Sequence, residues 1–178
     1  PANIDIDISI NNSNLYWLPK ELILFNNSKL NRKININLDT NSNLFFCETL
    51  IFGRKAMSEK IKNIFFSDNW KIYVNSKLKH FEAINLNGAF KDNYINNFTF
   101  NNKSSLSTIL IFGKIVENIE NELKQIVNNI QNLYCEMTKF NDKIIIRTLA
   151  NDNYDLKKAL YYIFKNIIHD KITKSWNL

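Results

Sequence analysis

Residues 3–10 read NIDIDISI, in which every second side chain is isoleucine: Ile4, Ile6, Ile8 and Ile10. Successive side chains of a β-strand point to opposite faces, so this alternation predicts a strand with one buried face. Residues 33–38 repeat the pattern, because Ile34, Ile36 and Leu38 alternate with lysine and asparagine. These two stretches favour a mainly β protein.

Further short apolar stretches recur about every ten residues and are separated by polar turn residues, a rhythm typical of a β-sandwich, barrel or β-solenoid. Pro19 ends one of them because proline cannot donate a hydrogen bond to a strand ladder. The stretches predict strands over residues 15–18, 22–25, 44–52, 59–66, 70–74, 78–86, 106–112 and 144–149.

The last third of the chain changes to a helical period. Apolar residues spaced along residues 116–133 predict one amphipathic helix, and a second starts near Asp152, which can cap it, with Asp155 three residues on. No Pro- or Gly-rich linker divides the chain. We therefore predict a single unit over residues 1–178, mainly β and sandwich- or solenoid-like, with two carboxy-terminal helices.

The composition is that of a globular protein with a basic balance. The chain has 178 residues, a net charge of +6 and a pI near 9.2. Its lysines are scattered, and heavy use of Asn, Ile, Lys and Phe indicates coding drift in an AT-rich genome, so we predict neither nucleic-acid nor membrane binding. Two distant cysteines favour a reducing, cytoplasmic compartment. Pro1 lies inside an expected strand, which predicts that sequence upstream of it is missing.

Motifs for catalysis or metal binding are absent from the sequence. It has no P-loop, no dinucleotide fingerprint, no nucleophile elbow and no zincin motif. The two histidines, His80 and His169, are far apart, and Cys47 is typical of a buried thiol. A stable metal site needs three or four ligands within reach. The sequence therefore predicts no catalytic residue and no stably bound cofactor, and it favours a binding or scaffold role.

Two features of residues 48–54 have both a structural and a functional interpretation. Glu48 is a charge inside an apolar strand, so it either pairs with Arg54 or Lys55, faces solvent, is a buried acid, or makes a weak contact with a metal cation. Gly53 permits a bulge or a positive φ at the end of that strand. Arg54 then lies either in an ordinary surface turn or at a protein interface, where arginine is enriched.

The order of these segments resembles the UreD (UreH) family of urease accessory proteins. Residues 15–25, LYWLPKELILF, are similar to its WLPQE-x-I-x-F stretch, and residues 46–59, FCETLIFGRKAMSE, to its E-x-L-x-x-GR-x-A-x-GE stretch. Ser58 and Lys20 depart from the family's usual Gly and Gln. The resemblance covers nearly the whole chain, and it implies the carboxy-terminal part of a longer protein.

The resemblance implies a non-enzymatic, β-rich scaffold. Such proteins bind apo-urease and, through UreF, the nickel-carrying GTPase UreG, and nickel is their transferred cargo rather than a cofactor. Carried over by position, the family-signature residues are candidates for an interface or for the walls of a nickel passage: Pro19, Glu21, Glu48, Gly53, Arg54 and Glu59.

Two other classes of function remain open at this point. A basic β-rich nucleic-acid-binding domain requires aromatic side chains interleaved with clustered basic residues on one sheet face. A β-rich hydrolase requires two positioned carboxylates. The sequence identifies neither arrangement.

Overall fold

The computed structural model describes residues 1–90, 100–101 and 103–176. The chain forms two compact units. The first contains Pro1–Asn14, Ile23–Ser42 and Phe52–Asn102, and the second contains Leu15–Leu22, Asn43–Ile51 and Lys103–Leu178. Each unit is built on its own sheet, and the single β-rich unit over residues 1–178 stays a prediction.

The first unit contains a four-stranded mixed sheet in the order β1-β4-β6-β7. Its strands are β1 (Ala2–Ile10), β4 (Lys29–Leu38), β6 (Asn63–Val74) and β7 (Lys77–Ala89). β1 and β6 run parallel to β4, and β7 runs antiparallel to β6 with a bulge at Ile72/Tyr73. β4 alternates buried and exposed residues along its length, as its sequence predicts.

One buried face of this sheet carries charged side chains. Arg32 on β4 lies opposite Asp68 on β6 and donates two hydrogen bonds to its carboxylate, from Nε to Oδ1 at 2.9 Å and from Nη2 to Oδ2 at 2.6 Å. Their side chains are only 8% and 0% exposed. On β7, Nε2 of the buried His80 lies 3.6 Å from Oε2 of Glu82.

The second unit contains a sheet in the order β2-β5-β8-β10-β9, with β3 paired to β5. The strands of this sheet are β2 (Asn14–Trp17), β5 (Asn43–Phe52), β8 (Ser105–Phe112), β9 (Tyr134–Phe140) and β10 (Lys143–Ala150). The short strand β3 (Leu22–Leu24) has Leu22 in the second unit and Ile23 and Leu24 in the first. β5, β8, β10 and β9 are successively antiparallel.

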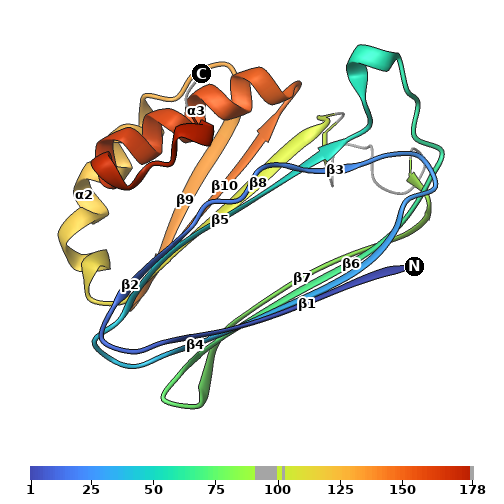
Figure 1. Ribbon diagram of the computed structural model, residues 1–178. Coiled ribbons are helices and arrows are strands. Elements are labelled where there is room, and N and C mark those ends of the chain that lie inside the picture. The colour runs from blue at the N-terminus through green and yellow to red at the C-terminus, as the bar shows by residue number, and fades with distance from the viewer. Residues whose placement is uncertain (91–99, 102, 177–178) are drawn as a thin grey trace. The chain divides into compact units, whose positions relative to one another are not determined.

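Two helices cover one face of this second sheet, and Figure 1 shows α2 (Ile115–Asn128) in gold and α3 (Asn153–Ile167) in orange-red on the same side of β8, β9 and β10. Both helices bury their apolar stripes against the sheet. The carboxylate of Asp152 caps α3 by accepting the Asp155 N–H at 3.0 Å, which confirms the predicted start. The mainly β fold with two carboxy-terminal helices is confirmed. No helix in the described part of the chain is long and apolar enough to cross a bilayer.

Several predicted boundaries are wrong. The two strands predicted over residues 59–66 and 70–74 belong to one strand, β6, which starts at Asn63. Glu59 lies in the loop before this strand. Helix α2 ends at Asn128, so Ile130 and Leu133 pack against the core from beyond the helix. Strand β9 was not predicted, because its sequence YCEMTKF offers only a short polar alternation with few β-branched residues. The shorter elements are the 3₁₀ turns η1 (Lys55–Met57), η2 (His169–Lys171) and η3 (Lys174–Trp176).

Candidate functional site

The loop after β5 begins with a glycine that the backbone requires. Gly53 has a φ of +80°, a left-handed conformation that other residues adopt only with strain. Its N–H donates to the Leu24 carbonyl at 2.8 Å. A Cβ at this position would lie 3.4 Å from Cγ1 of Ile61. The positive φ predicted at Gly53 is confirmed.

Arg54 and Glu59 close this loop on itself. Oε2 of Glu59 accepts from the Arg54 backbone N–H at 3.0 Å and from Nε at 3.2 Å, while Oε1 accepts from Nη2 at 3.1 Å. Between them, η1 is held by the Met57 N–H, which donates to the Arg54 carbonyl at 2.9 Å. We call residues 53–62 the clasp loop.

Asn26 anchors the clasp loop from the turn after β3. Its Oδ1 accepts from the backbone N–H groups of Lys62 at 2.8 Å and Asn63 at 3.2 Å. Its own N–H donates to Oε1 of Glu59 at 3.3 Å. The loop is therefore fixed at both ends by side chains that satisfy backbone donors, which lowers the entropic cost of binding a partner.

Large apolar side chains are exposed beside this fixed loop. Ile23 and Phe25 share one face of the β3 segment and are 46% and 48% exposed, and Met57 in η1 is 70% exposed. The Arg54 guanidinium lies 5.2 Å from the centroid of the Phe25 ring. Exposed apolar groups next to an arginine on a hydrogen-bonded loop have the chemistry of a protein-binding surface.

The hydrogen bonds between Arg54 and Glu59 in the clasp loop predict that the stability of the protein depends on pH. The hydrogen bonds from Arg54, together with those from backbone groups, lower the pKa of Glu59 below its ordinary value. A lowered folded-state pKa contributes stability that is present above the unfolded-state pKa, near 4.3, and is lost as pH falls through the folded-state pKa. Thermal unfolding should show Glu59→Gln to be less stable than the original protein at neutral pH, with the difference shrinking on acidification. A difference that is constant with pH would contradict this ionic role.

Glu48 is a buried acid on β5. It is 3% exposed, so the interpretation in which it faces solvent is wrong. Its Oε1 accepts a 2.7 Å hydrogen bond from the indole N–H of Trp17, whose ring stacks on Phe46 at 6.1 Å. Across the sheet, Glu48 lies opposite Thr108, and Thr108 lies opposite Arg147. Nη1 of Arg147 donates to the Thr108 hydroxyl at 3.2 Å. Arg54, the partner considered for Glu48, pairs with Glu59, and the side chain of Lys55 lies outside the described part.

The remaining signature residues lie in the short segment between β2 and β3. Glu21 accepts a hydrogen bond at 3.2 Å from the side-chain amide of Asn153, the first residue of α3. Leu18, just before the half-buried Pro19, accepts a 3.0 Å hydrogen bond from the indole N–H of Trp176. This segment therefore connects β2 to the carboxy-terminal helical layer, which is a structural role.

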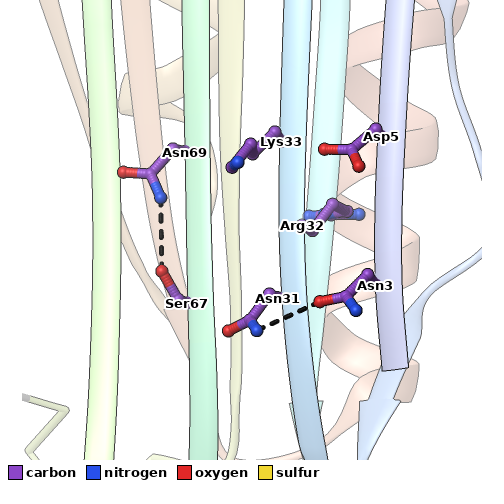
Figure 2. Close-up of a pocket in the computed structure, with 7 residues that line it drawn as sticks. All are labelled: Asn3, Asp5, Asn31, Arg32, Lys33, Ser67 and Asn69. Atoms are coloured by element: carbon purple, nitrogen blue, oxygen red, sulfur yellow. Dashed lines mark hydrogen bonds between the residues drawn. The ribbon is translucent and has the colours of Figure 1, made fainter. Parts of the chain in front are cut away.

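The four-stranded sheet has a polar hollow of about 430 Å³ on its exposed side. Figure 2 shows its side chains on three neighbouring strands, with amide hydrogen bonds from Asn31 to Asn3 at 3.1 Å and from Asn69 to Ser67 at 3.2 Å. None of the six signature residues lines it. Because its amides largely satisfy one another, we assign it no ligand.

The thiols and histidines do not form a reactive site in the described residues. Burial raises the pKa of Cys47 far above its ordinary value, and burial followed by the nearby Glu136 raises the pKa of Cys135 to about 12. Both thiols are therefore protonated and weakly nucleophilic at neutral pH. Within residues 1–90, 100–101 and 103–176, no three His, Cys, Asp or Glu side chains gather closely enough to hold a metal ion.

A family model described as the UreD urease accessory protein matches residues 1–174, which is nearly the entire chain. The chain belongs to the UreD family. Its signature stretches lie at β2–β3 and at β5 with the clasp loop. The family resemblance of the sequence is therefore confirmed.

Individual relatives carry the same description. A urease accessory protein UreD of Rhizobium rhizogenes is 28% identical over 163 residues, covering 91% of this chain and 59% of the relative. One from Agrobacterium fabrum is 28% identical over 165 residues, covering 92% and 57%. One from Rhodopseudomonas palustris is 38% identical over 88 residues, covering 49% and 32%. This UreD chain thus spans less than two-thirds of the length of these relatives.

The structure gathers three of the six UreD signature residues, Gly53, Arg54 and Glu59, in the clasp loop. It also adds residues that sequence reasoning missed. The over-use of asparagine throughout the chain hides Asn26, although its place in a polar turn between two apolar stretches is a signal. Trp17 was assigned only to an apolar strand, although a buried indole N–H needs an acceptor.

Proposed function

We propose that this UreD protein is a non-enzymatic scaffold of urease maturation in the cytoplasm. It binds apo-urease and UreF, and through UreF the nickel-carrying GTPase UreG, so that nickel can be inserted into the urease active site. One observation carries the proposal beyond family membership: Gly53, Arg54 and Glu59 build a hydrogen-bonded loop beside exposed apolar side chains. The two cysteines are free thiols, in keeping with a reducing compartment.

Co-purification tests the scaffold role. The complete reading frame, tagged and co-expressed with the urease structural and accessory genes, should recover urease subunits or UreF. The double variant Phe25→Ser/Met57→Ser should recover less of one partner, because it removes exposed apolar contacts at the clasp loop. Tyr162→Ser, which truncates a 43% exposed aromatic on α3, is the matched control. Folded protein that recovers neither partner would contradict the proposal and favour the nucleic-acid alternative.

The second part of the proposal concerns the path of nickel. A buried carboxylate such as Glu48 is suited to line a water-filled passage, because its negative charge offsets the desolvation cost of a passing cation. Glu48→Gln keeps an oxygen that can accept from Trp17 but removes that charge.

Glu48→Gln should therefore slow nickel transfer, measured as the rate of urease activation, while complex assembly stays intact. Glu117→Gln, which removes an exposed carboxylate from α2, should leave the rate unchanged. Equal activation rates for the original protein and Glu48→Gln would rule out a role for the charge.

A further inference from the structure

The second sheet leaves one part of its surface uncovered. On the face opposite the helices, the residues that β9 and β10 contribute are exposed or half-buried. Tyr134 and Phe140 on β9 are 53% and 54% exposed, and Ile145 and Leu149 on β10 are half-buried. Directly opposite residues share a face, and the register pairs Tyr134 with Leu149. We call this surface the β9–β10 face.

Cations surround the aromatic rings of this face. Nζ of Lys103 lies 5.3 Å from the Tyr134 ring centroid, and Nζ of Lys143 lies 5.9 Å from that of Phe140. Between them, Arg147 lies directly opposite Glu136. Glu136 is the one carboxylate that β9 and β10 carry, and it is outnumbered by Lys103, Lys143 and Arg147, so the exposed part of this face is positively charged and complementary to an acidic partner.

The outer edge of β9 is available to another strand. β9 ends the strand order of its sheet, and β10 is its only strand neighbour in the described part of the chain. A two-residue turn joins the two strands, so Phe140 and Lys143 form the closing hydrogen-bonded pair. The alternation of an antiparallel ladder then directs the backbone groups of Cys135, Met137 and Lys139 outward.

We infer that β9 and the β9–β10 face dock an extended, acidic segment of a partner protein, which adds to the sheet as a further strand. The outward backbone groups of β9 supply main-chain hydrogen bonds. Alternate apolar side chains of the partner pack beside Tyr134 and Phe140, and its carboxylates meet Lys103 and Lys143. This surface is separate from the clasp loop, and the inference does not depend on urease maturation.

A protein segment fits this face better than a nucleic acid does. Single-stranded nucleic acids bind by stacking bases on open aromatic faces, and here a lysine lies over each ring. The row of outward backbone donors and acceptors along β9 also matches the repeat of a polypeptide strand.

Fluorescence anisotropy with the complete protein tests the inference. The probes are a labelled peptide in which Glu and Val alternate, a matching peptide with Lys in place of Glu, and a labelled oligothymidylate. The acidic peptide should bind most tightly. Tyr134→Ser/Phe140→Ser should raise its Kd by roughly tenfold or more. Tyr154→Ser should leave the Kd unchanged, because it truncates another exposed aromatic with a lysine over its ring, on α3.

Each remaining outcome counts against the inference. No binding of the acidic peptide, equal binding of both peptides, or tighter binding of the oligothymidylate would overturn it. An equal loss for Tyr154→Ser would show that the effect is not specific to this face. Carbodiimide cross-linking then reports direct contact, because it should join Lys103 or Lys143 to a peptide glutamate and fail to do so in Lys103→Arg/Lys143→Arg.

Discussion

Replacing Arg32 with methionine should lower the free energy of unfolding by about 3–5 kcal/mol, because it leaves a buried carboxylate without its cation. Asp68 is 1% exposed, and Arg32 binds both of its oxygens. The guanidinium is therefore what offsets the desolvation of this charge. Chemical denaturation followed by circular dichroism measures the change.

Two further variants separate the charge from the packing. Arg32→Met/Asp68→Leu removes both charges and should recover most of the lost stability, since replacing a buried pair with apolar side chains is often neutral. Lys33→Met, at the next and exposed position of β4, should change stability by no more than about 0.5 kcal/mol. A double variant as unstable as Arg32→Met would mean that the pair matters through its shape and not through its charge.

Replacing Trp176 with alanine should cost about 3–5 kcal/mol, as expected for a large aromatic removed from a core. Trp176 is 1% exposed, and its ring packs edge-on against Phe164 with centroids 4.9 Å apart. Its indole N–H donates to the Leu18 carbonyl. The loss should appear as a lower denaturation midpoint for the unit that contains α3.

Trp176→Phe is the matched variant for this site. It keeps an aromatic ring against Phe164 but removes the hydrogen bond to Leu18, so it should cost less than alanine, with the lost bond contributing about 1 kcal/mol. If alanine and phenylalanine are equally destabilising, the hydrogen bond rather than the packing dominates. If alanine costs less than about 1 kcal/mol, the carboxy-terminal segment does not stabilise the core.

The elements with a strong period are those that the sequence predicts best. The alternation of residues 3–10 and 33–38 becomes β1 and β4, and the capping residue Asp152 gives the start of α3. β9 escapes prediction because its own sequence carries little strand signal, and its stability comes from contacts with other elements, by pairing with β10 and packing under α2. Ile130 and Leu133 continue the apolar period of α2 in the sequence, although the helix ends at Asn128. They too are placed by contacts with other elements.

The candidate site also has some parts that the sequence predicts and others that it does not. The signature stretches and the glycine at position 53 follow from the sequence, because a motif and a backbone requirement are local. The pairing of Arg54 with Glu59 and the anchoring by Asn26 do not, since each carboxylate in the chain had several possible partners. The burial of Glu48 likewise depends on what lies around β5 and not on the alternation within it.

The sequence by itself determined the family, the mainly β class and the two carboxy-terminal helices, because motifs, periodicity and capping residues are properties of neighbouring positions. The tertiary structure alone decided which charges are buried and paired, such as Arg32 with Asp68, and which aromatic side chains remain exposed, such as Tyr134 and Phe140. Those outcomes depend on strand register and on the order of strands in a sheet, which bring together residues far apart in the chain.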